Sequence, residues 1–405
     1  MASILFSEGS SLTSREFLSV LGPAGHHIEI VDPDPACICR LSRWTKHVHR
    51  CPPAASDPFG YLEVVNDLLA TGAFEVLLPT HEQAWLFAVG RSRLGKGARI
   101  AIASAEAFSR VQSKIEFACL LDEVGLPQPK WQLVDAPGKL DDWATPFYLK
   151  NSFSTAGSGV RKVTNSLDAT RAWESLYSTA GGDAIMVQAA ADGEYAQVQA
   201  LFDRGRLVAV HTSTQTAVGI GPSAAGRVGV DHAFARRDVA TLGDRLHWHG
   251  GLTVDYMFRG EDPLYIECNP RTVEPGNAAA SGVNLPELQL ALSRGEEIAG
   301  LRVGRPGVRT HSSLAVLLGT AAYHGTRKAV LGELLRLMAH RGRYEGSRDC
   351  LTPVLRDLPS LVPLATVASR VLLSPRSAVR LAGEAVTRYS MTADAIRQVS
   401  LETTS

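Results

Sequence analysis

The sequence of 405 residues lacks an excess of either charge, because 41 lysines and arginines balance 41 aspartates and glutamates. A general nucleic-acid-binding protein needs surplus positive charge, so this balance argues against that class, although it does not exclude a local basic patch. Long apolar runs are also missing, and the nearest, residues 361–373, is interrupted by Pro363 and Arg370. We therefore expect neither a nucleic acid nor a membrane as a partner.

Cysteine is scarce, with six residues, and the N-terminus has no basic segment followed by a long apolar run. No secretory signal is evident, so we expect reduced thiols and a cytoplasmic protein. Apolar residues make up 45% of the chain and charged residues 20%, which is typical of globular proteins. The length is sufficient for two or three domains with substantial cores.

A hairpin is predicted from two short alternating strands, residues 252–258 and 264–269, joined by a turn that contains glycine and proline. With the turn centred between them, Asp255 lies directly opposite Glu267. Opposed residues and residues two apart on a strand share one face of a sheet. One face of the hairpin therefore holds Asp255, Glu267 and Asn269.

Two carboxylates about 5 Å apart repel each other by roughly 3 kcal/mol at an effective dielectric constant near 20. A divalent cation between Asp255 and Glu267 would turn this repulsion into attraction. Two carboxylates and the amide of Asn269 offer oxygen ligands, which favour magnesium or manganese over zinc. Arg271 adds a positive charge beside this site. The alternative is an acidic hairpin face exposed to solvent.

The first hundred residues alternate between apolar strands and helices, which predicts a parallel sheet with covering helices. Such a sheet could bind a dinucleotide with Asp32 as the ribose ligand. The first turn has only Gly9 and lacks GxGxxG, so nicotinamide binding is not favoured. The predicted strands are residues 4–6, 28–31, 76–78 and 100–102, and the predicted helices are residues 13–21, 61–70 and 82–93.

Two lysines occur in settings that suit an anion. Ser113 begins a predicted capping box, so Lys114 lies at the positive end of a helix, where a nearby phosphate would favour it. Lys150 ends a strand at residues 146–150 and precedes a loop of small residues that could wrap a polyphosphate. The alternatives are an exposed lysine and an ordinary flexible hairpin tip, since the loop does not follow the Walker pattern.

The middle of the chain predicts a second, largely antiparallel sheet, with strands at residues 185–188, 195–202 and 207–210. Residues 217–229 are rich in glycine, alanine and serine, so we expect a mobile loop there. Beyond Pro306 the pattern becomes helical, with helices expected at residues 311–322, 327–341 and 367–382.

Taken together, these motifs resemble the ATP-grasp superfamily, and most of all its biotin carboxylase and carbamoyl-phosphate-synthetase-like carboxylate–amine ligases. The resemblance covers roughly residues 1–300. Its most specific part is Glu-Cys-Asn-Pro-Arg at residues 267–271, with Asp255 twelve residues before Glu267. This segment matches the family's metal-ligand spacing.

The resemblance implies an α/β and α+β protein. Residues 1–105 would form a Rossmann-like parallel sheet, and residues 106–300 the ATP-grasp domain, with a small lid part at about 145–190 and a larger antiparallel sheet. Residues 301–405 would form a mainly helical C-terminal extension.

The resemblance also implies roles for individual residues. Asp255, Glu267 and Asn269 would hold Mg²⁺ or Mn²⁺, and Arg271 would bind the acyl phosphate or its oxyanion. ATP would contact Lys114, Lys150, Ser154, Gly157, Ser158, Gln188, Ala191 and Glu194. The segment that follows His211 lacks an obvious arginine, so the anchor for a substrate carboxylate is unassigned, and biotin carboxylase chemistry itself is not supported.

The expected function is an ATP-dependent carboxylate–amine ligase that forms an amide or peptide bond through an acyl phosphate and releases ADP and phosphate. A phosphotransferase that does not ligate, and a non-catalytic ATP-binding module, are the alternatives. The expected partners are a small carboxylate and an amine, with amino acids as candidates for both and a homodimer as a candidate assembly.

Overall fold

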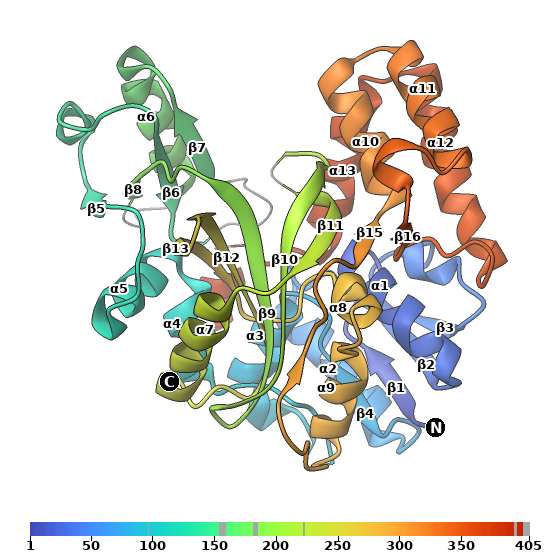
Figure 1. Ribbon diagram of the computed structural model, residues 1–405. Helices are drawn as coiled ribbons and strands as arrows, with labels where there is room; N and C mark the ends of the chain where they lie inside the picture. Colours follow the sequence, from blue (N-terminus) through green and yellow to red (C-terminus); the bar gives the residue numbers. More distant parts are fainter. Residues whose placement is uncertain (96, 154–158, 181–184, 222, 393–394, 400–405) are drawn as a thin grey trace.

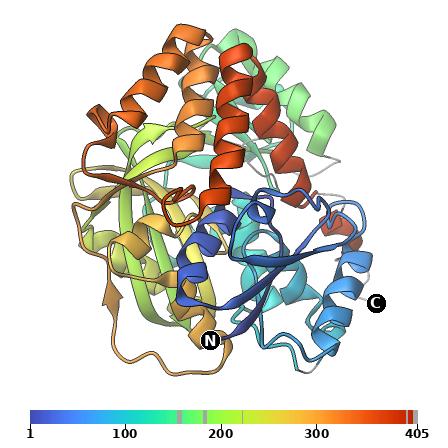
Figure 2. The same ribbon diagram turned by 90° about the vertical axis from the view of Figure 1, so that its right-hand side faces the viewer.

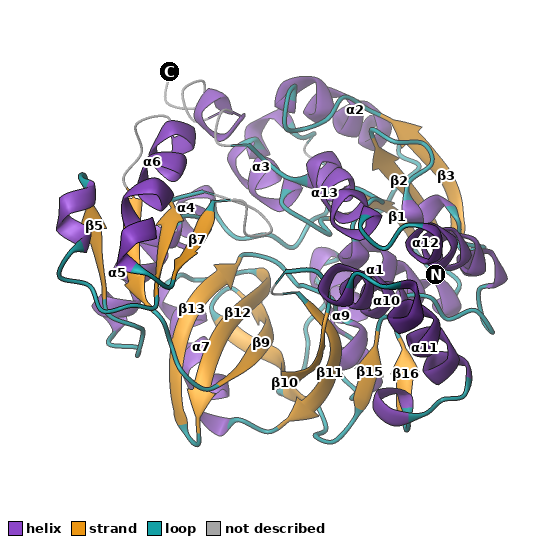
Figure 3. Cartoon of the chain, turned by 90° about the horizontal axis from the view of Figure 1, so that it is seen from above, coloured by secondary structure: helices purple, strands orange, loops and turns teal. Residues whose placement is uncertain are grey.

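The computed structural model describes the chain except for residues 96, 154–158, 181–184, 222, 393–394 and 400–405, and Figure 1 shows its arrangement. Strands of the described chain form three sheets, which appear as separate groups when viewed from above (Figure 3). Helices cover these sheets, and a group of helices from the C-terminal part stands above the N-terminal sheet (Figure 1). No helix in the described ranges combines the length and the apolarity needed to cross a membrane.

The N-terminal sheet is parallel, with the strand order β3-β2-β1-β4, as predicted. The predicted strand at residues 100–102 is wrong, because this segment joins the sheet only through the hydrogen bond from Leu77 N to Arg99 O. The sheet has instead a polar edge strand, β3, which its sequence did not reveal. The elements are β1 (Ser3–Phe6), α1 (Leu12–Leu21), β2 (His27–Asp32), β3 (Thr45–Arg50), α2 (Pro58–Ala70), β4 (Val76–Leu78) and α3 (Gln83–Val89).

The small sheet is antiparallel, with the order β5-β8-β6-β7. Helix α6 packs on it through Trp173 and Leu176, which close a separate core over Leu149 and Val187. Helices α4 and α5 connect it to the N-terminal sheet. The elements are α4 (Ala105–Gln112), α5 (Lys114–Val124), β5 (Trp131–Val134), β6 (Phe147–Asn151), β7 (Val160–Val163), α6 (Ala169–Ala180) and β8 (Ile185–Ala189).

The large sheet follows the order β13-β12-β9-β10-β11-β15-β16, with β14 paired to β10. Most of the described part of residues 217–229 is strand and not loop, because β10 ends at Val218 and β11, its antiparallel partner, begins at Ala224. Helix α10 packs closely here, since Ala217 and Ala225 share a core with Ala315 of that helix, and a Cβ atom on Gly319 would come within 2.6 Å of the Val218 carbonyl oxygen. Its strands are β9 (Glu194–Asp203), β10 (Arg206–Val218), β11 (Ala224–Val230), β12 (Gly250–Arg259), β13 (Asp262–Asn269), β14 (Arg302–Val303), β15 (Arg309–His311) and β16 (Ser347–Asp349).

Helix α7 packs on β9 and β10 through Ala235, Val239 and Leu242, which belong to the main core of the molecule. Helices α8 and α9 follow the hairpin formed by β12 and β13 and pack between the large sheet and the N-terminal sheet. The three helices are α7 (Ala233–Arg245), α8 (Gly276–Ala280) and α9 (Leu285–Ser293).

The C-terminal helices are α10 (Ser313–His324), α11 (Arg327–Met338), α12 (Leu361–Leu373) and α13 (Ser377–Tyr389). The single helix predicted at residues 367–382 is wrong, because the chain breaks at Ser374, and the residue before a proline disfavours helical backbone. Helix α13 descends from this group toward the N-terminal part (Figure 2). The chain then returns to the main core, where Met391 N donates to Glu82 Oε2 at 2.8 Å.

Candidate active site

The hairpin of β12 and β13 has the predicted register, with Asp255 opposite Glu267 and Thr253 opposite Asn269. A bulge directly after Asp255 shifts the pairing of the following residues. Cys268 is buried in the main core on the opposite face, as the alternation predicted. The two carboxylates and the amide therefore project from one face of the edge of the large sheet.

Asp255 is held by two hydrogen bonds. Tyr195 Oη donates to its Oδ1 at 2.8 Å, and Asn269 Nδ2 donates to its Oδ2 at 3.2 Å. Burial and the nearby charge of Glu267 raise the pKa of Asp255 to about 7. Without a cation, the pair thus avoids part of its repulsion by keeping a proton on Asp255 near neutral pH.

Glu267 is the charged member of the pair. Burial acts to raise its pKa, but Lys114 and Lys150 outweigh this effect and lower it. Lys114 Nζ lies 3.1 Å from Glu267 Oε1. A negative charge on Glu267 is therefore stabilised from the side of the two lysines, while Asp255 is enclosed by Tyr195 and Asn269.

The donor set fits a hard divalent cation, because it consists of carboxylate and amide oxygens on one face. The described residues contain no group of three histidine, cysteine or acidic side chains able to hold a metal ion, and this face itself has two carboxylates and an amide. Two acidic ligands and one amide leave room for phosphate oxygens, which is the usual way Mg²⁺ is bound beside a nucleotide. The amide of Asn269 turns its nitrogen to Asp255 and its oxygen to Arg271 Nη1 at 3.0 Å, so the amide would have to turn to offer its oxygen to a cation.

Lys150 lies at the end of β6 and reaches across to the hairpin. Its Nζ donates to Gln188 Oε1 at 2.6 Å and to the Ile266 carbonyl oxygen at 3.2 Å. Burial lowers the pKa of Lys150 to about 8, with Glu267 opposing this effect and Lys114 adding to it. Among the described residues, no carboxylate lies within ion-pair distance of this buried ammonium group, a situation that an anionic ligand would relieve.

Lys114 begins helix α5, as predicted, and Ser113 caps that helix by accepting from the Glu116 backbone N–H at 3.2 Å. The Lys114 backbone N–H donates to the Ser152 carbonyl oxygen at 2.9 Å, which ties the helix to the end of β6. The two predicted lysines are therefore brought to the same side of the hairpin from separate elements.

For the described part of the chain, the structure gives no contact between the remaining predicted nucleotide-binding residues and the metal-ligand face. Ala191 lies in the turn after β8, and Glu194 begins β9 opposite Phe258, three residues beyond Asp255. Ser154, Gly157 and Ser158 lie outside the described residues. The roles of all five remain predictions.

Arg271 contacts a residue from the N-terminal part of the chain. Its Nη2 lies 3.2 Å from Nε2 of His81, and burial together with Arg271 holds the pKa of His81 well below its usual value. A neutral His81 accepts from Arg271 at Nε2 and carries its proton on Nδ1. The Tyr389 ring lies against His81 with 4.3 Å between ring centroids, and Gln83 Nε2 donates to the Tyr389 carbonyl oxygen at 3.1 Å.

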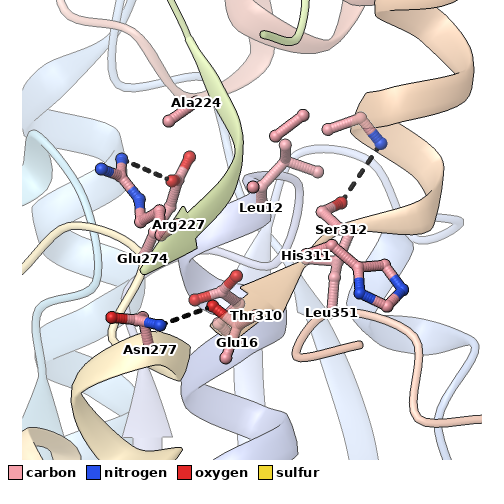
Figure 4. Close-up of a pocket in the computed structure, with 13 residues that line it drawn as sticks. Leu12, Glu16, Ala224, Arg227, Glu274, Asn277, Thr310, His311, Ser312 and Leu351 are labelled. Atoms are coloured by element: carbon pink, nitrogen blue, oxygen red, sulfur yellow. Dashed lines mark hydrogen bonds and ion pairs between the residues drawn. The ribbon is translucent and has the colours of Figure 1, made fainter. Parts of the chain in front are cut away.

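Four side chains of this region were given no individual role in the sequence: Tyr195, Arg227, His81 and Tyr389. His81 and Arg227 were considered only as parts of two segments, residues 80–82 and 212–229, that were expected to carry substrate specificity. They come from strands, a strand end and a helix that are far apart in sequence, so no local pattern connects them. Arg227 stood in a segment predicted to be a loop, although an arginine among small residues of alternating spacing is a pattern that could have identified it. Its side chain is buried and pairs with Glu274 at 3.0 Å (Figure 4).

Replacing Tyr389 by alanine is expected to reduce ATP-dependent ADP release by about tenfold to a hundredfold, because His81 would lose the ring that fixes it against Arg271. The apparent KM for ATP should change little, since Lys114 and Lys150 are untouched. Tyr389→Phe keeps the ring and should restore most of the rate. A wild-type rate in Tyr389→Ala would show that this ring does not position Arg271.

No family model matches the sequence. Among curated proteins, it is 27% identical over 161 residues to the acetyl-CoA carboxylase of Dictyostelium discoideum, which is 37% of this chain and 7% of that protein. It is 24% identical over 227 residues to the carbamoyl phosphate synthase large chain of Rubrobacter xylanophilus, which is 51% of this chain and 21% of that protein. The chain thus spans only a small part of the curated relatives that it matches.

Solved structures extend the similarity to most of the chain. The biotin carboxylase domain of the 2-oxoglutarate carboxylase of Hydrogenobacter thermophilus superposes with a TM-score of 0.61 at 13% identity, covering 74% of this chain and 71% of that one. The L-amino acid ligase of Bacillus licheniformis superposes with a TM-score of 0.56 at 14% identity, covering 72% and 74%. With its three sheets and the register of β12 and β13, the chain has the ATP-grasp fold.

Proposed function

We propose that this protein is an ATP-dependent carboxylate–amine ligase that forms an amide or peptide bond through an acyl phosphate. One observation carries the proposal. Asp255, Glu267 and Asn269 share one face of the hairpin, and two lysines from other elements converge on the same face. This arrangement suits a ligand of high negative charge, such as the phosphates of ATP with a bound cation.

The first step would transfer the γ-phosphoryl group of ATP. A carboxylate oxygen of the substrate attacks the γ-phosphorus, the bond to the β-phosphate oxygen breaks, and ADP leaves. Catalysis of this step needs positioning and neutralisation of charge more than covalent chemistry. Lys114 and Lys150 would supply positive charge, and Mg²⁺ or Mn²⁺ held by Asp255, Glu267 and Asn269 would neutralise the phosphate oxygens.

The second step would form the carbon–nitrogen bond. The nitrogen of an amine attacks the acyl carbon, a tetrahedral oxyanion forms, and phosphate leaves with the bonding electrons while the amine loses a proton. Arg271 would stabilise the oxyanion, with His81 fixing its guanidinium from the other side. Gln188, Ala191 and Glu194 would contact the nucleoside of ATP, and Ser154, Gly157 and Ser158 its phosphates.

The substrates would be small molecules, with amino acids as candidates for the carboxylate and the amine. The L-amino acid ligase with the same fold supports this choice, whereas the carboxylases among the relatives make bicarbonate the alternative carboxylate. We also propose that the protein acts in the cytoplasm, with a homodimer as the candidate assembly.

The test is to incubate the protein with ATP, Mg²⁺ and a panel of amino acids, small carboxylates and bicarbonate, and to separate the nucleotides and products by chromatography. We expect ADP and phosphate in a substrate-dependent manner, and a hydroxamate when hydroxylamine replaces the amine. AMP and pyrophosphate would contradict the proposal. ADP without hydroxamate would point to a phosphotransferase, and no substrate-dependent ADP to an ATP-binding module.

A further inference from the structure

Helix α11 is apolar both toward the protein and toward solvent. Val330 is buried in the core of the C-terminal helices, and Leu334 packs against the same core. Leu331, Leu335 and Met338 point away from it and are 51%, 58% and 77% exposed. A helix that is apolar on all sides is normally covered on all sides, and no described residue covers the outer side of α11.

The spacing of the exposed side chains puts them in one strip. Residues three and four apart are neighbours on the surface of a helix, so Leu331, Leu335 and Met338 adjoin one another, and Lys328 precedes them on the same side. We call these four residues the α11 strip. Helix α10 packs against α11, α12 and α13, and α11 lies on the outer side of this group, away from α6 (Figure 1). Single exposed leucines are normal, whereas a row of them indicates a surface that binds something.

Positive charge surrounds the α11 strip. Residues 326–343 contain five lysines and arginines and one acidic residue, Glu333, which leaves a net charge of +4. The carboxylate of Glu333 is buried and lies 3.0 Å from Arg336 Nη1 and 3.4 Å from Arg343 Nε, so it presents no negative charge at the surface. The five cationic side chains are all exposed, and they are Arg327, Lys328, Arg336, Arg341 and Arg343.

The end of α12 extends this surface. Arg327 donates from Nε and Nη2 to the Leu373 carbonyl oxygen at 3.2 and 2.7 Å, which joins the start of α11 to the end of α12. The side chain of Leu373 is 71% exposed. Residues 358–383 contain no acidic residue, and Arg370 and Arg376 are exposed. Apolar and cationic groups therefore continue from α11 onto the neighbouring helix.

A second copy of this chain would be a poor cover for this surface. In a two-fold dimer the same patch meets itself, so the cationic groups of α11 and α12 would lie opposite their own copies. Such groups repel one another, and the surface offers no exposed carboxylate within residues 326–343 except through the buried Glu333. The cover must instead supply negative charge and an apolar environment.

An anionic lipid surface supplies both. Aliphatic side chains that reach below the headgroups are buried there, and lysines and arginines beside them are attracted to the negative headgroups. The long side chain of Lys328 can lie along the apolar strip while its ammonium group stays among the phosphates. The sequence led us to expect no membrane as a partner because no segment is long enough to span one, and that reasoning does not apply to a helix that lies on the surface.

We propose that α11, with the adjoining end of α12, docks this protein on the surface of an anionic lipid bilayer. Leu331, Leu335 and Met338 enter the apolar region beneath the headgroups, and the surrounding cationic side chains contact the lipid phosphates. Docking uses no residue of the proposed ligase site, so each of the two proposals can fail without the other.

The test is cosedimentation of the full chain with two kinds of vesicle, one of phosphatidylcholine alone and one of phosphatidylcholine and phosphatidylglycerol in equal amounts. We expect binding to the anionic vesicles to be at least about tenfold tighter. Raising the salt concentration from about 0.1 M to about 1 M should release most of the bound protein, because charges are then screened over a few ångströms. Equal binding to both vesicles, or no binding to the anionic ones, would overturn the proposal.

The apolar part of the surface is tested by the double variant Leu331→Gln with Leu335→Gln. Glutamine favours a helix about as well as leucine does, so α11 should remain folded, and an unchanged thermal unfolding midpoint checks this. Binding to the anionic vesicles should weaken about tenfold or more. The matched control is Leu133→Gln with Leu167→Gln, two exposed leucines on the small-sheet side of the molecule, which should bind normally. Equal binding by both double variants would contradict the assignment of α11.

The cationic part is tested by Lys328→Gln with Arg341→Gln, which should also weaken binding to the anionic vesicles about tenfold. Lys139→Gln with Lys162→Gln removes the same charge from exposed positions elsewhere and should retain most of the binding. If both pairs weakened binding equally, only the overall charge would matter, and the docking surface would be wrong.

Sedimentation velocity of the protein without lipid identifies the other covers. A dimer that dissociates in the Leu331→Gln, Leu335→Gln variant, together with no binding to vesicles, would assign the surface to a second copy and overturn the proposal. A monomer that binds no vesicles would also overturn it, in favour of an acidic protein partner.

Discussion

Glu267→Gln is expected to reduce Mg²⁺-dependent ADP formation by about a thousandfold or more. The substitution removes the one carboxylate of the hairpin face whose pKa is lowered by both Lys114 and Lys150, and a neutral amide neutralises a cation poorly. The fold should be retained, because the change also removes the repulsion with Asp255. The measurement is ADP formation by chromatography together with the thermal unfolding midpoint.

The control for this prediction is Glu261→Gln, which makes the same chemical change in the exposed turn of the same hairpin. It should keep the wild-type rate and the wild-type midpoint. If Glu267→Gln folded normally and turned over within tenfold of the wild type, the metal-ligand assignment of this face would be wrong.

Lys150→Met is expected to weaken ATP binding about a hundredfold. The ammonium group would be lost from a position between Gln188 and the Ile266 carbonyl oxygen, where no other described side chain supplies it. Methionine fills a similar volume, and removing a buried charge without a close ion-pair partner should leave the unfolding midpoint unchanged or raise it. Binding is measured by titration with a non-hydrolysable ATP analogue.

The pH dependence gives this prediction a second readout. Burial sets the pKa of Lys150 at about 8, so the group is charged below pH 8 and loses its proton as the pH rises above that value. The affinity of the wild type for the ATP analogue should therefore fall as the pH is raised above 8. Lys150→Met should not show this fall. Lys162→Met on the neighbouring strand is the exposed control. A wild-type affinity in Lys150→Met would remove this lysine from the nucleotide site.

The hairpin shows what could be predicted from the sequence. Its strands are consecutive, its turn is short, and side-chain alternation fixes which residues share a face, so the pairing of Asp255 with Glu267 followed from local rules. The capping of α5 by Ser113 is equally local. The parallel N-terminal sheet was predicted from the alternation of strands and helices along the chain. The resemblance to the ATP-grasp superfamily added the prediction that the hairpin and the two lysines form one site.

What the sequence did not predict depends on packing between distant segments. The sequence predicted a loop at residues 217–229 because small residues are typical of loops, yet Ala217 and Ala225 lie in strands and pack against Ala315 of α10. The pairing of Arg227 with Glu274 became visible only in the structure, where β11 places the two side chains together. The contact of His81 with Tyr389 joins two distant parts of the chain, and no pattern of hydrophobic residues along the sequence predicts a contact over such a separation.

The return of the chain after α13 also matters during synthesis on the ribosome. When residue 271 has been added, every proposed metal ligand, both lysines and Arg271 have been made. His81 still lacks the ring of Tyr389, and Glu82 still lacks the backbone N–H of Met391. A nascent chain would thus contain the proposed ATP-binding residues well before the contacts that fix Arg271 can form. Turnover would therefore begin only after translation has passed residue 391.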